Sequence, residues 1–162
     1  MKRHPGLHAL SEHHHHALVQ ALLIRRADQA PSSKRAAALQ KTARDFLRFW
    51  KKTGQKHFRE EEEVLLPAYS RHVPLEEDPA VIRMLADHAS IRARIQDLAK
   101  AVAEKRAVEA ELTVLGRLLH DHVRHEENQV FPRIETALGE VELLALGRRL
   151  SRLHQQPKSQ ST

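Results

Sequence analysis

The chain has 162 residues, of which 13 are histidine and none is cysteine, and its formal net charge is +6. This length suffices for one domain with a substantial core, and the absence of cysteine excludes disulfides, thiolate zinc sites, cysteine-ligated iron–sulfur clusters and thiol catalysis. The basic charge does not indicate a nucleic-acid partner, because Lys and Arg are scattered along the chain and aromatic residues, at 4%, are too few to stack on bases.

Apolar residues recur at helical spacing through most of the chain, and no stretch has the alternation that is typical of a strand. The first predicted helix runs from Leu7 to about Gln29. A second, long one runs from about Lys34 to Leu66; Gly54 is a point where it can loosen, and Pro67 lies near its end. Residues 72–79, with two prolines and three acids, are predicted to form the main loop.

The third predicted helix starts after Asp78, a residue type that caps helix N-termini, and continues over residues 79–105. The fourth covers about residues 108–131, and Pro132 is expected to mark its end. A short fifth amphipathic helix follows over about residues 140–153.

These helices predict an all-α bundle with short connections. We expect one domain over residues 7–153, with flexible termini at residues 1–6 and 154–162. No uncharged apolar run reaches the length of a membrane span, and the first residues lack the apolar region of a signal peptide. We therefore expect a cytoplasmic protein with no membrane partner.

One sequence motif, called the repeated phrase below, occurs twice with the same spacing between its residues, in residues 57–67 and again in residues 122–132. Each copy has His, then Arg two positions later, Glu four and five positions later, two apolar residues and Pro. In a helix, residues four apart lie on one face, so the His and the first Glu of each copy point the same way. These pairs are His57 with Glu61 and His122 with Glu126.

Both pairs lie within apolar stripes of their helices. A buried carboxylate without a counter-charge costs too much free energy to persist, and no Lys or Arg occupies either stripe beside the glutamates. A metal cation is therefore the favoured partner. The apolar members are Phe46, Trp50 and Leu65 for the first pair, and Leu112, Leu115, Leu119 and Val130 for the second.

The other two helices each place a lone histidine on the apolar face. His88 is central to its stripe, with apolar residues one turn before and after it. In the first helix the candidates are His8 and the run at residues 13–16, of which His14 falls closest to the centre of the face, with His15 as the alternative.

Four imidazoles and two carboxylates suit two divalent cations, with both glutamates bridging them. Asp87 or Asp121 is a candidate to orient an imidazole, and the rest of the acidic run at residues 60–63 is expected to be a solvated face. His125, one turn from His122, is either a substitute ligand or without a role. The six predicted metal ligands are His14, His57, Glu61, His88, His122 and Glu126.

These two phrases, together with Leu10-Ser11 before the histidine run, resemble the hemerythrin-like proteins with an HHE cation-binding domain, and the likeness covers residues 7–153. The resemblance implies an up-down four-helix bundle with a fifth short helix. It also implies two iron ions, joined by an oxo or hydroxo bridge, that react with O₂, NO or peroxide. Zinc or manganese can substitute for iron in such a site.

Two positions differ from those of the oxygen-carrying hemerythrins. Met84 stands where those proteins have a further histidine, and Glu126 follows its histidine at four positions where they have an aspartate at five. We therefore expect a protein that binds or senses O₂, NO or peroxide, with its signal read by a protein partner, rather than an enzyme. The alternatives are iron handling, peroxide or NO detoxification and repair, or a structural metal bundle.

Overall fold

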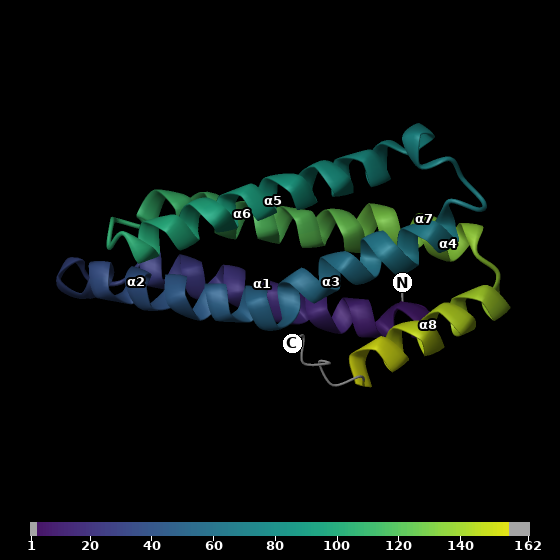
Figure 1. Cartoon of the computed structure of the whole chain (residues 1–162), viewed down its shortest axis with the longest axis horizontal. Coiled ribbons are helices and arrows are strands. Elements are labelled where there is room, and N and C mark those ends of the chain that lie inside the picture. The colour runs from purple at the N-terminus through teal and green to yellow at the C-terminus, as the bar shows by residue number, and fades with distance from the viewer. Residues whose placement is uncertain (1–2, 156–162) are drawn as a thin grey trace, which may run out of the picture.

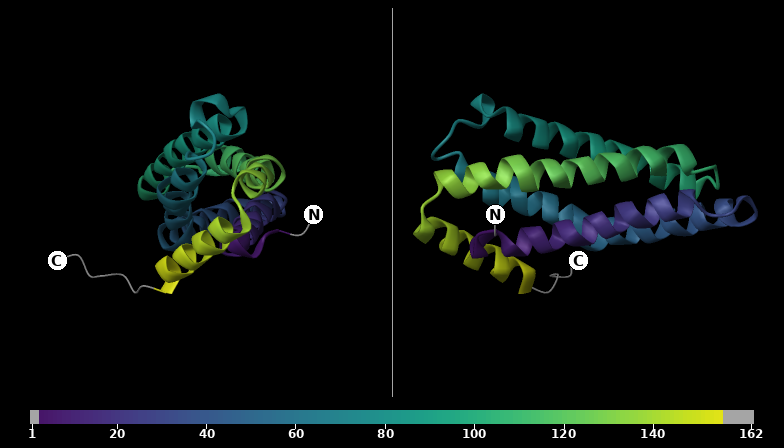
Figure 2. Two further views of the ribbon diagram at one scale, coloured as in Figure 1. Left: turned by 90° about the vertical axis from the view of Figure 1, so that its right-hand side faces the viewer. Right: turned by 180° about the vertical axis from the view of Figure 1, so that it is seen from behind.

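The computed structural model describes residues 3–155, and this part of the chain is almost wholly helical, without strands. Four helical rods run antiparallel to one another, and a last helix crosses one end of the bundle (Figures 1 and 2). Neighbouring rods in the sequence are neighbours in space, and the first also contacts the fourth. The predicted all-α, up-down four-helix architecture with a short C-terminal helix is confirmed.

Each rod consists of one or more consecutive helical segments. The first rod is α1 (His8–Asp28), preceded by a 3₁₀ turn, η1 (Pro5–Leu7). The second is continuous through α2 (Ser32–Phe49), η2 (Trp50–Gly54), α3 (Gln55–Glu60), η3 (Glu61–Leu65) and α4 (Leu66–Tyr69). The turn η4 (Leu75–Glu77) leads to the third rod, α5 (Pro79–Ala103). The fourth joins α6 (Glu109–His125), η5 (Glu126–Val130) and α7 (Phe131–Ala137), and α8 (Glu140–Gln155) follows.

The prediction that Pro132 marks the end of the fourth helix was wrong, whereas Pro67 does lie near the end of the second rod, as predicted. The second rod continues to Tyr69 and the fourth to Ala137. In each case a π turn precedes the proline: the Leu66 N–H donates to the Glu61 carbonyl and the Phe131 N–H to the Glu126 carbonyl, five residues back. The wider turn displaces the carbonyl that a proline ring meets in a regular α-helix, so the rod passes through without ending.

The predicted start of the third rod is confirmed, and it is also tied to the second rod. Asp78 accepts a hydrogen bond from the Ala80 N–H at 2.9 Å, and Pro79 occupies the first turn of the helix. The Tyr69 hydroxyl donates to the other Asp78 carboxylate oxygen at 2.8 Å. This buried contact fixes where α5 begins relative to the end of α4.

The core consists of two apolar clusters, with the predicted polar residues between them on every rod. On the first rod and the turn η1 before it, Leu7 and Leu10 belong to one cluster and Ala17 and Ile24 to the other, with His14 between. On each of the remaining rods, polar residues likewise lie where one apolar cluster gives way to the other. The dividing residues there are His57 and Glu61 on the second rod, His88 on the third, and His122 and Glu126 on the fourth.

The N-terminal residues are part of this packing. Gly6 and Gly147 lie so close that a Cβ on Gly147 would come within 2.7 Å of the Gly6 Cα, so η1 and α8 touch backbone to backbone. Arg3 and His4 bond to Glu135 on α7. Residues 3–6, expected to belong to a flexible terminus, are therefore held against the bundle. Residues 1–2 and 156–162 of the predicted flexible termini lie outside the described residues.

Gly54 closes the π turn η2, where the second rod was predicted to loosen. A Cβ there would lie 2.5 Å from Cε3 of Trp50, whose ring packs edge-on against Phe58. Gly54→Ala should lower the free energy of unfolding by up to about 2 kcal/mol in urea titrations. The overpacking cost of roughly 1–3 kcal/mol exceeds the gain of about 1 kcal/mol that alanine brings to a helix.

Gly139→Ala is the matched control, because nothing lies within 4 Å of a Cβ at that position and its φ is not positive. It should change the free energy of unfolding by less than about 0.5 kcal/mol. A Gly54→Ala protein at least as stable as the parent would show that the Trp50 ring moves aside without cost.

Candidate metal centre

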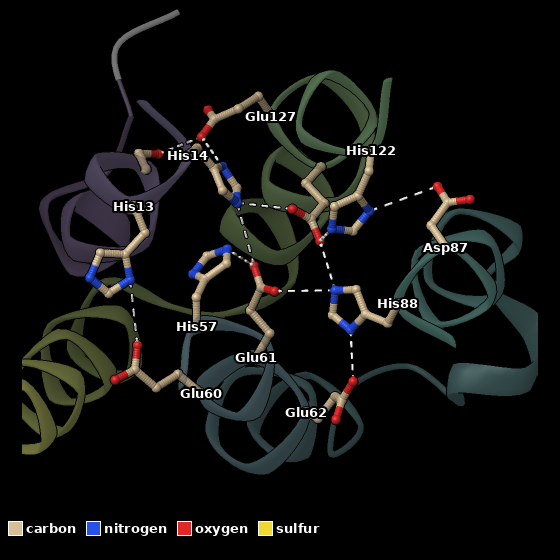
Figure 3. Close-up of polar contacts among 12 residues, drawn as sticks. His13, His14, His57, Glu60, Glu61, Glu62, Asp87, His88, His122 and Glu127 are labelled. Atoms are coloured by element: carbon tan, nitrogen blue, oxygen red, sulfur yellow. Dashed lines mark hydrogen bonds and ion pairs between the residues drawn. The ribbon is translucent and has the colours of Figure 1, made fainter. Parts of the chain in front are cut away.

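The six predicted ligands meet at one level of the bundle, with their polar ends turned toward one another (Figure 3). Each is at most 5% exposed. His14 is the member from the first rod, and His15, the alternative, is exposed. Helix phase therefore selected the inward residue from a run of four histidines.

One group of potential ligands joins the first, second and fourth rods. The His14 Nε2 lies 2.9 Å from Glu126 Oε2 and 3.6 Å from Glu61 Oε1. The His57 Nε2 lies 3.3 Å from that same Glu61 Oε1. One ligand atom from each of the four residues falls within 4.8 Å of all the others, so a single cation can contact them together.

A second group, His88, His122 and Glu126, joins the third and fourth rods, and Glu61 of the second rod lies beside it. The His122 Nε2 lies 3.1 Å from Glu126 Oε1, and the His88 Nε2 lies 3.4 Å from both Glu126 Oε1 and Glu61 Oε2. Each glutamate thus turns one oxygen toward the first group and the other toward the second. This is the arrangement that bridging carboxylates require.

The donor atoms fit divalent cations, because they lie at ion-pair distances from one another without forming hydrogen bonds. The Nε2 atoms of all four histidines and both carboxylate oxygens of both glutamates are buried and lack a hydrogen-bond partner in the described structure. Unpaired buried polar atoms are costly and rare in folded proteins. Two ligands at right angles on a cation with bonds near 2.1 Å stand about 3 Å apart, close to the separations in this centre.

A family model described as the Hemerythrin HHE cation binding domain matches residues 6–134. The chain belongs to the hemerythrin family. The matched span contains all six candidate ligands and all but the last residues of the four rods, while α8 lies beyond it. Comparisons with curated proteins and with solved structures each found no match. Cation binding follows from the family and agrees with the unpaired donor set.

No helix in residues 3–155 of this hemerythrin-family chain is both long and apolar enough to cross a membrane.

Two imidazoles of this hemerythrin centre, His88 and His14, hold protons when no cation is bound. Burial lowers the pKa of His88, but its contacts with Glu126, Glu61 and Glu62 outweigh burial and raise that pKa to about 11. His14 follows the same pattern: burial opposes the charge, and neighbouring carboxylates, Glu126 foremost, raise its pKa well above the ordinary value. Two of the ligands are therefore imidazolium near neutral pH.

The remaining charges of the centre follow from the same neighbours. Burial lowers the pKa of His57 to about 3, so this imidazole is neutral. Burial also opposes ionisation of Glu61 and Glu126, but the surrounding histidines, among them His57 and His14 for Glu61 and His122 and His14 for Glu126, lower both pKa values below the ordinary range. Both carboxylates are thus ionised and ready to bind a cation.

The second glutamate of each phrase reaches a histidine on a neighbouring rod. The His14 Nδ1–H donates to Glu127 Oε1 at 2.6 Å, and the His88 Nδ1–H donates to Glu62 Oε1 at 2.7 Å. Burial raises the pKa of these two carboxyl groups, but the histidine contacts outweigh it and bring both to about 2. Such partners fix which ring nitrogen faces the metal.

The expectation that residues 60–63 beyond Glu61 form a solvated face was wrong for two positions. Glu62 contacts His88, and Glu60 is 3% exposed on the side of His13. Only Glu63 matches the expectation, since it is exposed and pairs with Arg59. The repeat contained a usable signal, because a Glu directly after each ligand Glu projects toward the adjacent rod.

Of the two aspartates proposed to orient an imidazole, only Asp87 is near the centre. Its Oδ2 lies 3.8 Å from His122 Nδ1, an ion-pair distance, and this contact lowers the pKa of the Asp87 carboxyl. Asp121 is exposed and pairs with His120.

Filling the centre should release protons, because a cation replaces those on His14 and His88. We expect about two protons per chain at pH 7 when both groups are filled with Zn²⁺, measured by calorimetry in buffers of different ionisation enthalpy. Because the pKa values of both imidazoles are raised, protons compete with the metal, and the apparent affinity should rise with pH. Release of less than one proton, or an affinity independent of pH, would contradict the protonated state of these two imidazoles.

His122 and His125 are one turn apart but have different surroundings. The His125 Nε2 lies 2.9 Å from the Ala80 carbonyl, outside the two groups. His122→Ala should weaken Zn²⁺ binding by more than about 100-fold, beyond the 10–100-fold cost of losing a supporting residue, whereas His125→Ala should weaken it less than about tenfold. Equal losses in equilibrium dialysis would make His125 a ligand.

Proposed function

We propose that the chain holds two iron ions, one in each group of ligands, and binds or senses O₂, NO or peroxide at them. The observation that carries the proposal is the pair of bridging glutamates, whose oxygens divide between the two groups. Each position then receives two imidazole nitrogens and two carboxylate oxygens from the protein. Iron commonly takes up to six ligands, so positions for a small external ligand stay open, whereas four ligands satisfy structural zinc.

When bound, iron supplies one-electron redox chemistry and the open coordination positions. The chain's own residues supply the charge balance: Glu61 and Glu126 offset two of the positive charges in a water-poor core. Glu62 and Glu127 hold His88 and His14 with their Nε2 atoms toward the centre. The protein thereby fixes both metal positions before an external ligand arrives.

A small apolar cavity beside the centre is evidence for a diatomic ligand. It has a volume of about 20 Å³ and is bounded by His57 and His122, one imidazole from each group, and by aromatic side chains such as Phe46 and Phe58. A space of this size holds one small molecule and no organic substrate. Its apolar lining suits O₂ or NO, which need no hydrogen-bond partners. In a sensing role, a protein partner would read the change at the centre.

Iron handling is the second candidate function. A surface pocket, separate from the small apolar cavity, favours it. An open, largely polar surface hollow of about 520 Å³ is lined by His14, Glu127 and Arg3, so the first position lies near solvent on that side. Such an opening suits exchange of the metal itself. Peroxide or NO detoxification and a purely structural role are the remaining alternatives.

The deciding experiment is elemental analysis and an ultraviolet–visible spectrum of the chain purified without a tag or added metal. We expect two irons per chain and near-ultraviolet absorption that changes on adding O₂ or NO. One zinc or none, with a featureless spectrum even after anaerobic iron loading, would make the bundle a structural scaffold and overturn the proposed iron function. Sustained peroxide turnover that His57→Ala abolishes would favour the enzymatic alternative.

The bridging role is tested in the same preparations. Glu61→Ala and Glu126→Ala should each lose metal and melt at a lower temperature than the loaded parent, because the carboxylate is both ligand and counter-charge. Glu63→Ala is the matched control, since Glu63 belongs to the same acidic run but is exposed and pairs with Arg59. Two metals retained in both test variants would refute the bridging assignment.

A further inference from the structure

One arginine is linked to the first metal position through a glutamate. The Arg3 guanidinium donates to Glu127 Oε2 at 2.8 Å and to the Glu127 carbonyl at 2.6 Å, and the other carboxylate oxygen accepts the His14 Nδ1–H. Ser11 and Glu135 complete the contacts, since the Ser11 hydroxyl donates to Glu127 and Arg3 donates to Glu135. The Arg3 side chain is only 17% exposed.

A second arginine is linked to the other position in the same way. The Arg92 guanidinium donates to Glu62 Oε2 at 2.8 Å and lies 2.8 Å from Oε1, the oxygen that accepts the His88 Nδ1–H. The two series of contacts lie on opposite sides of the centre, and Figure 3 shows Glu127 on one side and Glu62 on the other. Each metal position therefore has its own series of arginine, glutamate and histidine.

An aromatic ring reinforces each series. The His14 ring stacks on Phe131 at 5.0 Å, and the Arg3 guanidinium carbon lies 5.2 Å from the same ring centre. The His88 ring stacks on Phe58 at 3.7 Å, with the Arg92 guanidinium carbon at 5.3 Å. These contacts hold the imidazole planes and the guanidinium groups against shared apolar supports.

The other two imidazoles lack a hydrogen bond of this kind, and His122 has only the 3.8 Å ion-pair contact of its Nδ1 with Asp87 Oδ2. The Nδ1 atoms of His57 and His122 make no hydrogen bond within the described structure. Each position therefore combines one imidazole that is hydrogen-bonded to an arginine-linked carboxylate with one whose Nδ1 makes no hydrogen bond. The supported imidazoles are those on α1 and α5, outside the repeated phrase.

We propose that Arg3 and Arg92 are positioning residues, each of which sets the affinity and ligand geometry of one metal position through its glutamate. The inference rests on the proposed two-metal function. A carboxylate that accepts the Nδ1–H keeps the Nε2 lone pair on the metal and makes the imidazole a better donor. Glu127 and Glu62 are 25% and 27% exposed, so without the arginine each side chain is free to turn toward water.

The two positions consequently depend on different parts of the fold. Arg92 lies within α5, whose packing fixes it. Arg3 precedes η1, and its place depends on the seating of the N-terminal segment, residues 3–7, against α7 and α8. The first position is thus coupled to the N-terminal segment and the second is not.

The test is anaerobic titration of the metal-free full chain with Co²⁺, followed by visible absorption. Two background variants allow each metal position to be titrated by itself. His122→Ala disables the second position, and His57→Ala disables the first. In the His122→Ala background, Arg3→Ala should weaken the remaining Co²⁺ by about 10–100-fold and shift its absorption, while Arg92→Ala changes neither. In the His57→Ala background the two arginine variants should exchange these effects.

Matched variants distinguish positioning from stability. Arg3→Lys and Arg92→Lys keep the charge but lose the two-point contact, so each should give an affinity between parent and alanine variant. Arg59→Ala is the control, because Arg59 pairs with Glu63 at 64% exposure, away from the centre, and should leave both affinities and spectra unchanged. Helical circular dichroism identifies any variant that fails to fold, and the lysine variants then carry the test.

The outcomes separate the two proposals. A parent chain that binds fewer than two Co²⁺ defeats the two-metal function. A parent that binds two, with arginine variants that change neither affinity nor absorption, overturns the positioning role alone. Equal weakening of both positions by each arginine variant also overturns it, since that result indicates a general loss of stability.

Discussion

The structure depends on two ionised glutamates buried in the middle of a helical bundle. Glu61 and Glu126 are fully buried, and such charges persist only with counter-charges close by. Four imidazoles surround them, two of which are protonated while no cation is bound, so the charge is balanced either by protons or by metal. The antiparallel rods, the two apolar clusters and the repeated phrase all serve to bring these six side chains to one level.

Much of the fold and of the ligand set was predictable from the sequence, because apolar residues recur with the helical period along each rod. Charged or polar residues inside an apolar stripe are conspicuous, and the phase of α1 alone separates inward His14 from exposed His15. What the period could not predict is contact between rods. Glu62 and Glu127 lie off the inward stripe, and their roles follow from the distance to the next rod. Arg3 was missed for the same reason, since nothing local in residues 1–6 indicates a partner on η5 and α7.

The prolines illustrate a second limit of prediction from local sequence. A proline ordinarily ends or kinks a helix, and the two rods avoid this with π turns that begin at Glu61 and Glu126. The 3.6-residue period of apolar side chains does not reveal that one turn of each rod contains an extra residue, as a π turn does. Turns of this kind are frequent at functional sites, and in this bundle one feature of the backbone serves both the helix's continuity and the placement of the ligand.

The spread of the ligands along the chain has a consequence for how the protein is made. A ribosome releases the chain from its N-terminus, and the first position needs His14, His57 and Glu61 together with Glu126 from the fourth rod. The Arg3–Glu127 contact likewise joins the beginning of the chain to that rod. A nascent chain therefore exposes an incomplete, charged core until the fourth rod has emerged. The full set of candidate ligands is therefore available to a cation only after the fourth rod has been made.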